Sequence, residues 1–310
     1  MNDLRIAWSP SSFCDIDDAP LRLLERVGAT VIPNPFGRRL TADEAVAHVI
    51  GVDGLIAGLE PLTREVLASA PRLKAVARVG IGMDNLDLAA AQELGIKVSN
   101  TPDPPAESVA ELTMAAMLVL LRGLVRTNEG MHAGQWPKVI HPGLNRTSVL
   151  LVGFGRIGRA VARRLMAFGA DVLVFDPFLT KLDEPGVRQV GLGEGLAAAR
   201  VVSLHAAGTD RVIGPDELRA MAPGSFLLNS ARGELVDEDA LIDALERGHL
   251  AGAWFDVFWE EPYQGRLTHF DQVLLTPHIG TYTDACRREM EMQATLNLLR
   301  DLGVEAEGVA

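Results

Sequence analysis

Residues Thr147–Asp176 read TSVLLVGFGRIGRAVARRLMAFGADVLVFD, and this stretch decides the fold of the 310-residue chain. It opens with an apolar, β-branched run typical of a strand that is buried on both faces. A glycine-rich turn follows, and the next segment places apolar residues at helical spacing. Gly169 ends that helix, and a second apolar run leads to Asp176. The stretch therefore predicts a strand–helix–strand unit with G-x-G-x-x-G between its first strand and its helix.

Each glycine of this turn has a predicted task in dinucleotide binding. Gly153 permits the tight turn out of the strand, Gly155 lets a pyrophosphate approach the backbone, and Gly158 lets helix and strand pack closely. The N-terminus of the helix attracts phosphate through its N–H groups and its dipole. Asp176 falls where a carboxylate binds the ribose hydroxyls of NAD and repels the extra phosphate of NADP. The stretch predicts NAD as the cofactor.

The length, net charge and cysteine content of the chain argue against several classes of protein. A chain of 310 residues is long enough for two domains. Its net charge of −12 argues against nucleic acid and anionic membrane surfaces as partners. No apolar run is long enough to span a bilayer, and the N-terminus lacks a signal-peptide pattern. The only cysteines, Cys14 and Cys286, lie far apart in sequence, which favours a reducing compartment. We therefore expect a cytoplasmic protein.

The first hundred residues alternate strands and helices, which predicts a small α/β unit of their own. In it, Thr41–Glu44 is a capping box that opens a helix. The segment Arg78–Gly82 follows a strand and combines a cation with two glycines. Its N–H groups suit a substrate carboxylate, but an ordinary strand-to-helix turn explains the pattern equally well. The breaker Thr101–Pro105 marks a domain boundary, and Ser108–Glu111 is interpreted as a second capping box that opens a long helix.

Four polar residues follow the ends of the later strands. Arg232, Asp256 and His278 stand just beyond three apolar runs, and Glu261 comes shortly after Asp256. Taken singly, each is readily a surface or structural residue. Ligands of open parallel sheets bind beyond the carboxyl ends of the strands, however, so together these residues point to a site near a nicotinamide.

Their chemistry fits hydride transfer to a 2-oxo acid. Arg232 can clamp the carboxylate and polarise the carbonyl. His278 can donate a proton to the carbonyl oxygen, and Glu261 can stabilise the imidazolium. No cluster of Cys or His at ligand spacing completes a metal site, and no G-x-S-x-G elbow is present. The expected reaction is the reversible, NADH-dependent reduction of a 2-oxo acid.

At this point the chain resembles the NAD-dependent D-isomer-specific 2-hydroxyacid dehydrogenases, which include phosphoglycerate dehydrogenase. The similar motifs, in chain order, are Arg78-x-Gly80-x-Gly82-x-Asp84-Asn85, Asn100-Thr101-Pro102, Gly153–Gly158 with Asp176, Asn229-Ser230-Ala231-Arg232-Gly233, Asp256-Val257-Phe258 with Glu261-Pro262, and Pro277-His278-Ile279-Gly280. The resemblance implies that Arg232, Glu261 and His278 are catalytic. It implies that NAD is bound by Gly153, Gly155, Arg156, Ile157, Gly158, Asp176, Ser230, Ala231, Asp256 and Gly280. Substrate would be bound by Arg78, Val79, Gly80, Ile81, Gly82, Lys138 and Tyr282.

The resemblance also implies an architecture. Two doubly wound parallel-sheet domains, Rossmann-like or flavodoxin-like, are expected, with the substrate-binding domain discontinuous. That domain would comprise 1–99 plus 283–310, and the NAD-binding domain would comprise 100–282. An arm at about 106–140 would join two copies into a homodimer and bring Lys138 towards an acidic substrate group.

Some positions depart from the family pattern and leave the substrate open. His205-Ala-Ala-Gly-Thr209 replaces the usual His-x-Pro-Leu-Thr, and Tyr282 stands where a small residue is common. Gly58 stands where phosphoglycerate dehydrogenases often carry an arginine, which argues against phosphoglycerate. Glu60 would disfavour a second negative charge on the substrate, whereas Lys138 would welcome one. The alternatives are a dinucleotide-sensing protein similar to corepressors of this fold, and a formate or phosphite dehydrogenase.

Overall fold

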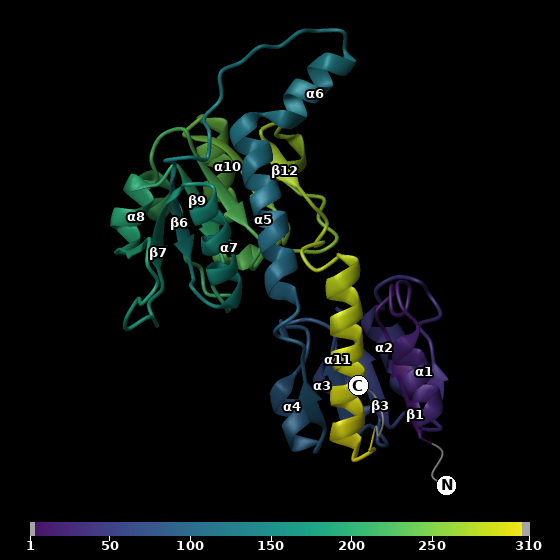
Figure 1. Ribbon diagram of the computed structural model, residues 1–310. Coiled ribbons are helices and arrows are strands. Elements are labelled where there is room, and N and C mark those ends of the chain that lie inside the picture. The colour runs from purple at the N-terminus through teal and green to yellow at the C-terminus, as the bar shows by residue number, and fades with distance from the viewer. Residues whose placement is uncertain (1–3, 306–310) are drawn as a thin grey trace. The chain divides into compact units, whose positions relative to one another are not determined.

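Buried aliphatic runs form two separate parallel sheets, one in each of two units (Figure 1). The computed structural model describes residues 4–305. The first unit comprises the described part of Met1–Pro105 and Thr281–Ala310, and the second comprises Ala106–Gly280. The first unit is thus discontinuous in sequence. The prediction of two doubly wound α/β domains with parallel sheets is confirmed.

The sheet of the first unit has the order β2-β1-β3-β4-β5. Its strands are β1 (Arg5–Trp8), β2 (Thr30–Ile32), β3 (Gly54–Ala57), β4 (Ala75–Arg78) and β5 (Lys97–Ser99). Its helices are α1 (Ala19–Arg26), α2 (Ala42–Val49), α3 (Arg64–Ala68), α4 (Leu88–Glu93) and α11 (Asp284–Leu302). The strand order reverses between β1 and β3, which is the kind of position where doubly wound sheets bind ligands.

Local sequence explains how two helices of this unit are fixed. Thr41 caps α2 as predicted: its hydroxyl accepts the Glu44 N–H, and the Glu44 carboxylate accepts the Thr41 N–H. The helix α11 packs on β3, where Gly54 leaves room for it. A Cβ at Gly54 would lie 2.9 Å from Leu302 Cδ1. The last helix of the chain thereby completes the core of the first unit.

The sheet of the second unit has the order β12-β11-β10-β9-β6-β7-β8. Its strands are β6 (Ser148–Val152), β7 (Asp171–Phe175), β8 (Val187–Gln189), β9 (Val201–Leu204), β10 (Ser225–Asn229), β11 (Leu250–Phe255) and β12 (Val273–Leu275). Its helices are α5 (Pro105–Arg122), α6 (Leu124–His132), α7 (Arg156–Ala167), α8 (Leu192–Ala198), α9 (Pro215–Ala220), α10 (Glu238–Glu246) and the short 3-10 helices η1 (Gly233–Leu235) and η2 (Arg266–His269). Here the order reverses between β9 and β6, beside the glycine turn.

Two apolar clusters cover the two faces of this larger sheet. One lies under α8, α9 and α10 and includes Leu150, Leu227 and Phe255. The other lies under α5 and α7 and includes Met117 and Trp254. Because side chains of successive strand residues point to opposite faces, each buried strand supplies residues to both clusters. The sheet therefore has no face open to solvent at its centre, as expected for a parallel sheet.

The start of α5 differs from the prediction. The helix begins at Pro105, not at Ser108. Proline has no N–H to leave unsatisfied, and its fixed φ suits the first turn of a helix. Ser108 therefore lies inside the helix, and its hydroxyl donates to the Gly280 carbonyl oxygen instead of capping a helix end. The predicted capping box at Ser108–Glu111 is wrong.

Among the described residues, no helix by itself has the length and apolar composition needed to cross a membrane. The consecutive helices α5 and α6 satisfy that criterion only when taken together, and they are bent by 61° at their junction. The junction is Gly123, which adopts a left-handed conformation with φ of 57°.

Candidate active site

The glycine turn of the second unit has the geometry of a dinucleotide cradle. Gly153 has φ of +95°, and a Cβ there would lie 2.6 Å from the Ala206 nitrogen. A Cβ at Gly158 would lie 2.3 Å from the Gly153 carbonyl oxygen, so only glycine lets the start of α7 pack here. Gly155, by contrast, has no atom within 4 Å of its Cβ position. The turn is tight on its inner side and open at Gly155, where the backbone can approach a pyrophosphate.

Asp176 follows β7 and lies beside this turn. Its Oδ2 accepts the Phe154 N–H at 2.8 Å, and its Oδ1 accepts the Phe178 N–H at 2.9 Å. The carboxylate is thus fixed next to the open turn, and Arg156 and Ile157 begin α7 directly after Gly155. The residues present fit the adenosine and pyrophosphate parts of NAD.

His278 and Glu261 form an ion-pair contact in the second unit. His278 Nδ1 lies 2.9 Å from Glu261 Oε2 and 3.1 Å from Oε1. The side chains are 34% and 23% exposed, so the pair is reachable but partly desolvated. Glu261 is itself oriented by the Phe258 N–H, which donates to Oε1 at 3.2 Å. The structure therefore brings together two of the three residues predicted to be catalytic, although they come from the ends of different strands.

Asp256 holds the segment that carries His278. The Thr276 hydroxyl and the Ile279 N–H donate to Oδ1 at 2.6 and 2.9 Å, and the Gly280 N–H donates to Oδ2 at 2.8 Å. The carboxyl is 2% exposed, and burial raises the pKa of Asp256 above its ordinary value, against the opposing effect of these donors. Sequence reasoning placed Asp256 at the cofactor. It missed this positioning role, because the hydrogen bonds join residues that lie on separate strands.

Arg232 lies at the end of β10 in a turn shaped by Asn229. The Asn229 side chain accepts the Ala231 N–H at 3.0 Å and donates to the Arg232 carbonyl at 2.7 Å. The following Gly233 packs against the Phe258–Trp259 backbone, since a Cβ there would lie 2.3 Å from the Phe258 carbonyl carbon. The Arg232 turn is thus fixed against the segment that leads to Glu261.

The end of β9 carries His205, which the sequence marked as the start of a segment that departs from the family pattern but to which no role was assigned. His205 Nε2 lies 2.9 Å from the Ser203 hydroxyl, and its carbonyl group lies against Gly153. The ring is enclosed, and this burial lowers the pKa of His205 to about 4. His205 is therefore neutral near pH 7 and forms one wall of the glycine turn. The signal in the sequence was its position directly after a buried strand.

The predicted substrate loop Arg78–Gly82 lies in the first unit. The Arg78 guanidinium donates to the Val79 carbonyl and folds over Gly80. The Val79 and Gly80 N–H groups already have acceptors, which are Ala57 O and the Thr101 hydroxyl. The N–H groups of Ile81 and Gly82 have no acceptor among residues 4–305, so these are the backbone donors of the loop that remain for a carboxylate.

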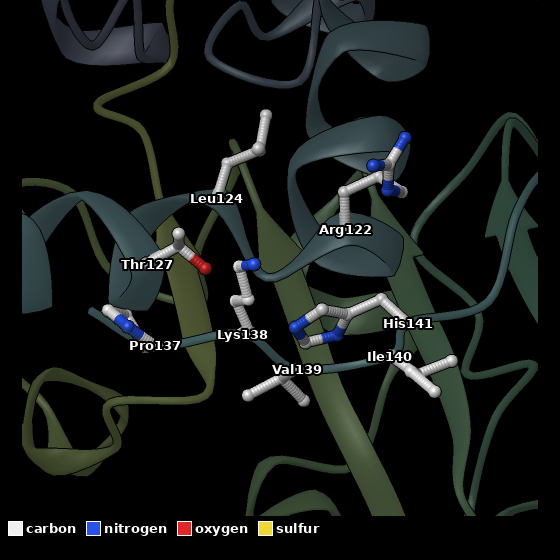
Figure 2. Close-up of a pocket in the computed structure, with 8 residues that line it drawn as sticks. All are labelled: Arg122, Leu124, Thr127, Pro137, Lys138, Val139, Ile140 and His141. Atoms are coloured by element: carbon white, nitrogen blue, oxygen red, sulfur yellow. The ribbon is translucent and has the colours of Figure 1, made fainter.

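Lys138 and Tyr282 lie in different units. Lys138 follows α6 and, with a set of neighbours, lines a pocket of about 290 Å³ (Figure 2). The other lining residues are Arg122, Leu124, Thr127, Pro137, Val139, Ile140 and His141. Tyr282 is 56% exposed in the first unit, and the Arg287 guanidinium carbon lies 5.3 Å from its ring centre.

Comparison with known proteins agrees with this geometry. The chain matches the family model described as D-isomer specific 2-hydroxyacid dehydrogenase, NAD binding domain, over residues 114–280. It is 34% identical to a hydroxypyruvate reductase of Thermotoga maritima over 275 residues, which are 86% of this chain and 90% of that protein. It is also 34% identical to a D-3-phosphoglycerate dehydrogenase of Methanocaldococcus jannaschii, but it spans only 52% of that protein. Among solved structures, the TT0316 protein of Thermus thermophilus superposes with a TM-score of 0.88 at 36% identity, covering 98% of this chain and 99% of the other.

The match over more than half of the chain and the coverage of the reductase agree with the glycine cradle, the Asp176 position and the Glu261–His278 pair. NAD is the cofactor, as predicted. The chain belongs to the D-isomer-specific 2-hydroxyacid dehydrogenase family and is an NAD-dependent oxidoreductase.

Proposed function

We propose that this enzyme reversibly reduces a small 2-oxo acid to the D-2-hydroxy acid with NADH. The observation that carries the proposal is the 2.9 Å contact between His278 Nδ1 and Glu261. A carboxylate that accepts the Nδ1 proton fixes the tautomer and orientation of the imidazole and leaves Nε2 to exchange a proton with substrate. The similarity to a hydroxypyruvate reductase supports this reaction class.

In this proposal the chain's own residues handle the substrate and the proton. Bound NADH supplies the hydride. Arg232 binds the substrate carboxylate and polarises the carbonyl, as a planar cation with several donors can do. His278 Nε2 gives a proton to the carbonyl oxygen, and Glu261 stabilises the imidazolium whenever His278 carries both protons.

The residues proposed to bind NAD belong to the second unit. We propose that the second unit is the NAD-binding domain and that it contacts NAD through Gly153, Gly155, Arg156, Ile157, Gly158, Asp176, Ser230, Ala231, Asp256 and Gly280. In the described part of the chain, the hydrogen-bond donors to the Asp256 carboxylate all belong to the Thr276–Gly280 segment. Asp256 therefore contributes to the nicotinamide end of the proposed NAD site mainly by fixing the conformation of this segment.

The first unit is proposed to be the substrate-binding domain. Ile81 and Gly82 offer N–H groups to a carboxylate beside Arg78. At the end of β3, Gly58 turns tightly: its N–H donates to the Glu60 carboxylate, and a Cβ there would meet Pro10 and Glu60. Glu60 is 1% exposed, and this burial raises the pKa of its carboxyl group, whose oxygens accept hydrogen bonds and so do not favour a second anionic group at this edge of the sheet. We therefore propose a substrate without a phosphate or second carboxylate, such as hydroxypyruvate.

The assembly is also a proposal. We propose a homodimer formed through the arm at 106–140, with Lys138 in it, because several large apolar side chains are exposed there. They are Leu124, Val125, Met131, Trp136, Val139 and Ile140. A cytoplasmic location is proposed because both cysteines, Cys14 and Cys286, are free thiols.

Kinetics of two substitutions test the proposal. The wild-type enzyme is assayed with NADH and hydroxypyruvate beside His278→Gln and Arg232→Ala, with His269→Gln as the control for an exposed histidine of the same unit. We expect kcat to fall by about 10²- to 10⁴-fold in His278→Gln. In Arg232→Ala, kcat/KM should fall while NADH affinity is retained. Normal turnover in His278→Gln would show that His278 is not the proton donor.

A further inference from the structure

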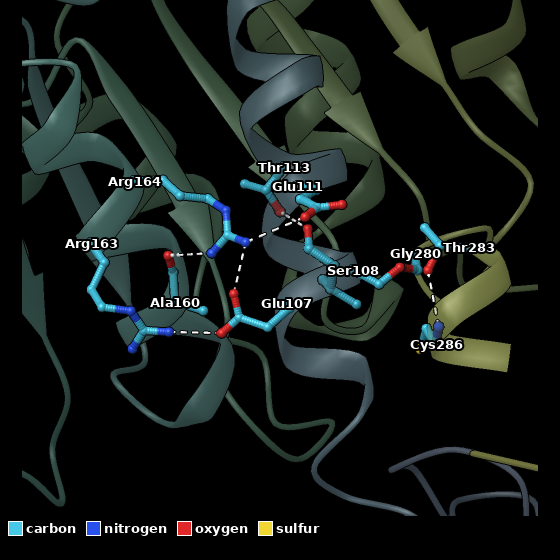
Figure 3. A network of polar contacts seen from close by, with 11 residues as sticks. Glu107, Ser108, Glu111, Thr113, Ala160, Arg163, Arg164, Gly280, Thr283 and Cys286 are labelled. Carbon is cyan, nitrogen blue, oxygen red and sulfur yellow. Dashed lines mark hydrogen bonds and ion pairs between the residues drawn. The ribbon is translucent and has the colours of Figure 1, made fainter. Parts of the chain in front are cut away.

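Ser108 lies in the first turn of α5, and its hydroxyl is hydrogen-bonded to Gly280 (Figure 3). Gly280 ends the segment Pro277–Gly280, which contains His278. The side chain of Ser108 is buried, with 5% of the residue exposed. The hydroxyl donates to the Gly280 carbonyl oxygen at 2.7 Å, across 172 positions of sequence. A buried bond of this length between distant segments fixes both of them.

Both the carbonyl and the N–H of Gly280 are hydrogen-bonded. Its carbonyl accepts the Ser108 hydroxyl, and its N–H donates to Asp256 Oδ2 at 2.8 Å. A Cβ at Gly280 would lie 3.1 Å from that same oxygen and 3.1 Å from Val109 Cγ2. The glycine is therefore enclosed between the end of β11 and α5, and these two elements define its position.

His278 is only two residues away, and its backbone needs such support. It has φ of 55°, in the left-handed region that residues other than glycine adopt uncommonly. Residues in this region persist when the surrounding structure over-determines them. Here the support comes from Asp256, which binds the segment on both sides of His278, and from Ser108 at its far end.

The helix α5, which carries Ser108, is bound by ion pairs to α7, the helix that follows the glycine turn. Glu107, the preceding residue, accepts hydrogen bonds from Arg163 and Arg164, each at 2.7 Å (Figure 3). Further along α5, the Thr113 hydroxyl donates to the Val109 carbonyl and lies 3.5 Å from the Ser230 hydroxyl. One helix thus contacts α7, the Arg232 turn and the His278 segment of the second unit.

We infer that Ser108 is a positioning residue for the proton transfer. By holding the Gly280 carbonyl against α5, it keeps the Pro277–Gly280 segment in the one conformation that places His278 Nδ1 on Glu261. Ser108 makes no hydrogen bond with either of these two side chains among residues 4–305, so it acts through the backbone. The inference rests on the proposed role of His278 as the proton donor.

The test compares Ser108→Ala with Ser108→Thr and with Ser225→Ala. Threonine retains the hydroxyl and serves as the conservative rescue. Ser225 is a matched control: it is also a buried serine of the second unit, and its hydroxyl has no hydrogen-bond partner among residues 4–305. The measurements are kcat, the KM for NADH and for hydroxypyruvate, the solvent deuterium isotope effect on kcat, and hydrogen exchange at the Ile279 and Gly280 amides.

For Ser108→Ala we expect kcat to fall about 10- to 100-fold, because small displacements of a catalytic group have effects of this size. The KM for NADH should change less than about twofold, since the glycine cradle is intact, and the solvent isotope effect should rise as proton transfer becomes limiting. Exchange at the Ile279 and Gly280 amides should accelerate. Ser108→Thr should restore kcat to within about threefold of wild type, and Ser225→Ala should match wild type throughout.

Other results overturn the inference. Unchanged kcat and unchanged exchange in Ser108→Ala would show that the bond positions nothing. A loss of NADH binding in parallel with kcat in both Ser108 variants would show a purely structural role. If wild-type enzyme reduces hydroxypyruvate but His278→Gln is fully active, the proposed function fails in its proton donor. The exchange rates at Ile279 and Gly280 then still decide whether Ser108 holds the segment.

Discussion

In the second unit, some residues contact the proposed proton donor His278 directly, and others hold the backbone around it in place. Glu261 orients His278 directly, whereas Asp256 acts on the same histidine through two neighbouring N–H groups. The contact of Glu261 with His278 was predictable, because the carboxyl ends of parallel strands meet at one edge of a sheet. The support from Asp256 and Ser108 was not, because it depends on which backbone groups face a buried oxygen. No sequence pattern records that orientation.

Asp176 should control the choice between NAD and NADP. Its carboxylate is fixed at the glycine turn by the Phe154 and Phe178 N–H groups, and it would repel a 2′-phosphate. We expect Asp176→Ser to lower kcat/KM for NADH at least about tenfold and to raise it for NADPH. Steady-state kinetics with both cofactors measure this, with Asp183→Ser as the exposed-acid control. An unchanged preference in Asp176→Ser would mean that another group reads the ribose.

Whole elements were predicted where their pattern is long. The strand–turn–helix–strand stretch around the glycine turn has the expected order, and the capping box of α2 is present. The strands β5 and β8 were not predicted, because each has three residues of which only one is apolar; β2 and β12 are equally short but more apolar, and they were predicted. The start of α5 was misplaced because a serine followed by a glutamate resembles a cap even when its hydroxyl is bonded elsewhere.

The turn between β6 and α7 should respond differently to alanine at its two later glycines. In Gly158→Ala the new Cβ would lie 2.3 Å from the Gly153 carbonyl, so we expect a loss of about 1–3 kcal/mol in the free energy of unfolding. Gly155 has φ of −75° and open space around its Cβ position, so Gly155→Ala should leave stability almost unchanged. Gly155→Ala should nevertheless weaken NADH binding, because the methyl group occupies the approach of the pyrophosphate.

Urea unfolding and NADH titration of both glycine variants separate these effects. The expected pattern is a destabilised Gly158→Ala and a stable Gly155→Ala with reduced NADH affinity. Tight NADH binding by Gly155→Ala would contradict the placement of the cofactor at this turn.

At the scale of the whole chain, each unit has its own sheet and its own buried clusters. The sequence predicted this division from the Pro-rich break and from the two sets of alternating elements. The substrate could not be predicted from the sequence. The side chains of Glu60 and Arg78 in the first unit form hydrogen bonds with backbone groups, and no motif specifies these contacts.

The stability of the second unit should depend on the protonation of His205. Burial lowers the pKa of His205 to about 4, whereas an unfolded histidine titrates at about 6.5. The unfolded chain therefore binds a proton first as pH falls, so this contribution is complete above about pH 6.5 and is lost towards about pH 4. The loss amounts to about 2 kcal/mol at about pH 5. Burial raises the pKa of Asp256, which acts in the opposite direction, so the comparison must be between variants.

The measurement is the free energy of unfolding of the cofactor-free enzyme at about pH 7 and about pH 5. His205→Gln should lose less stability over this interval than wild type, by about 2 kcal/mol. The control His132→Gln changes an exposed histidine of α6 and should follow wild type. Equal slopes for His205→Gln and wild type would show that His205 is accessible to protons in the native state.

The reduction of a 2-oxo acid with NADH is the reaction that we propose for this enzyme. The most direct measurement incubates the wild-type enzyme with NADH and a panel of 2-oxo acids, follows nicotinamide absorbance, and determines the configuration of the product. Formate with NAD forms a parallel arm. We expect that hydroxypyruvate or another acid without a second charge oxidises NADH and yields the D-hydroxy acid. NADH binding with no oxidation by any acid, or turnover with formate alone, would contradict it.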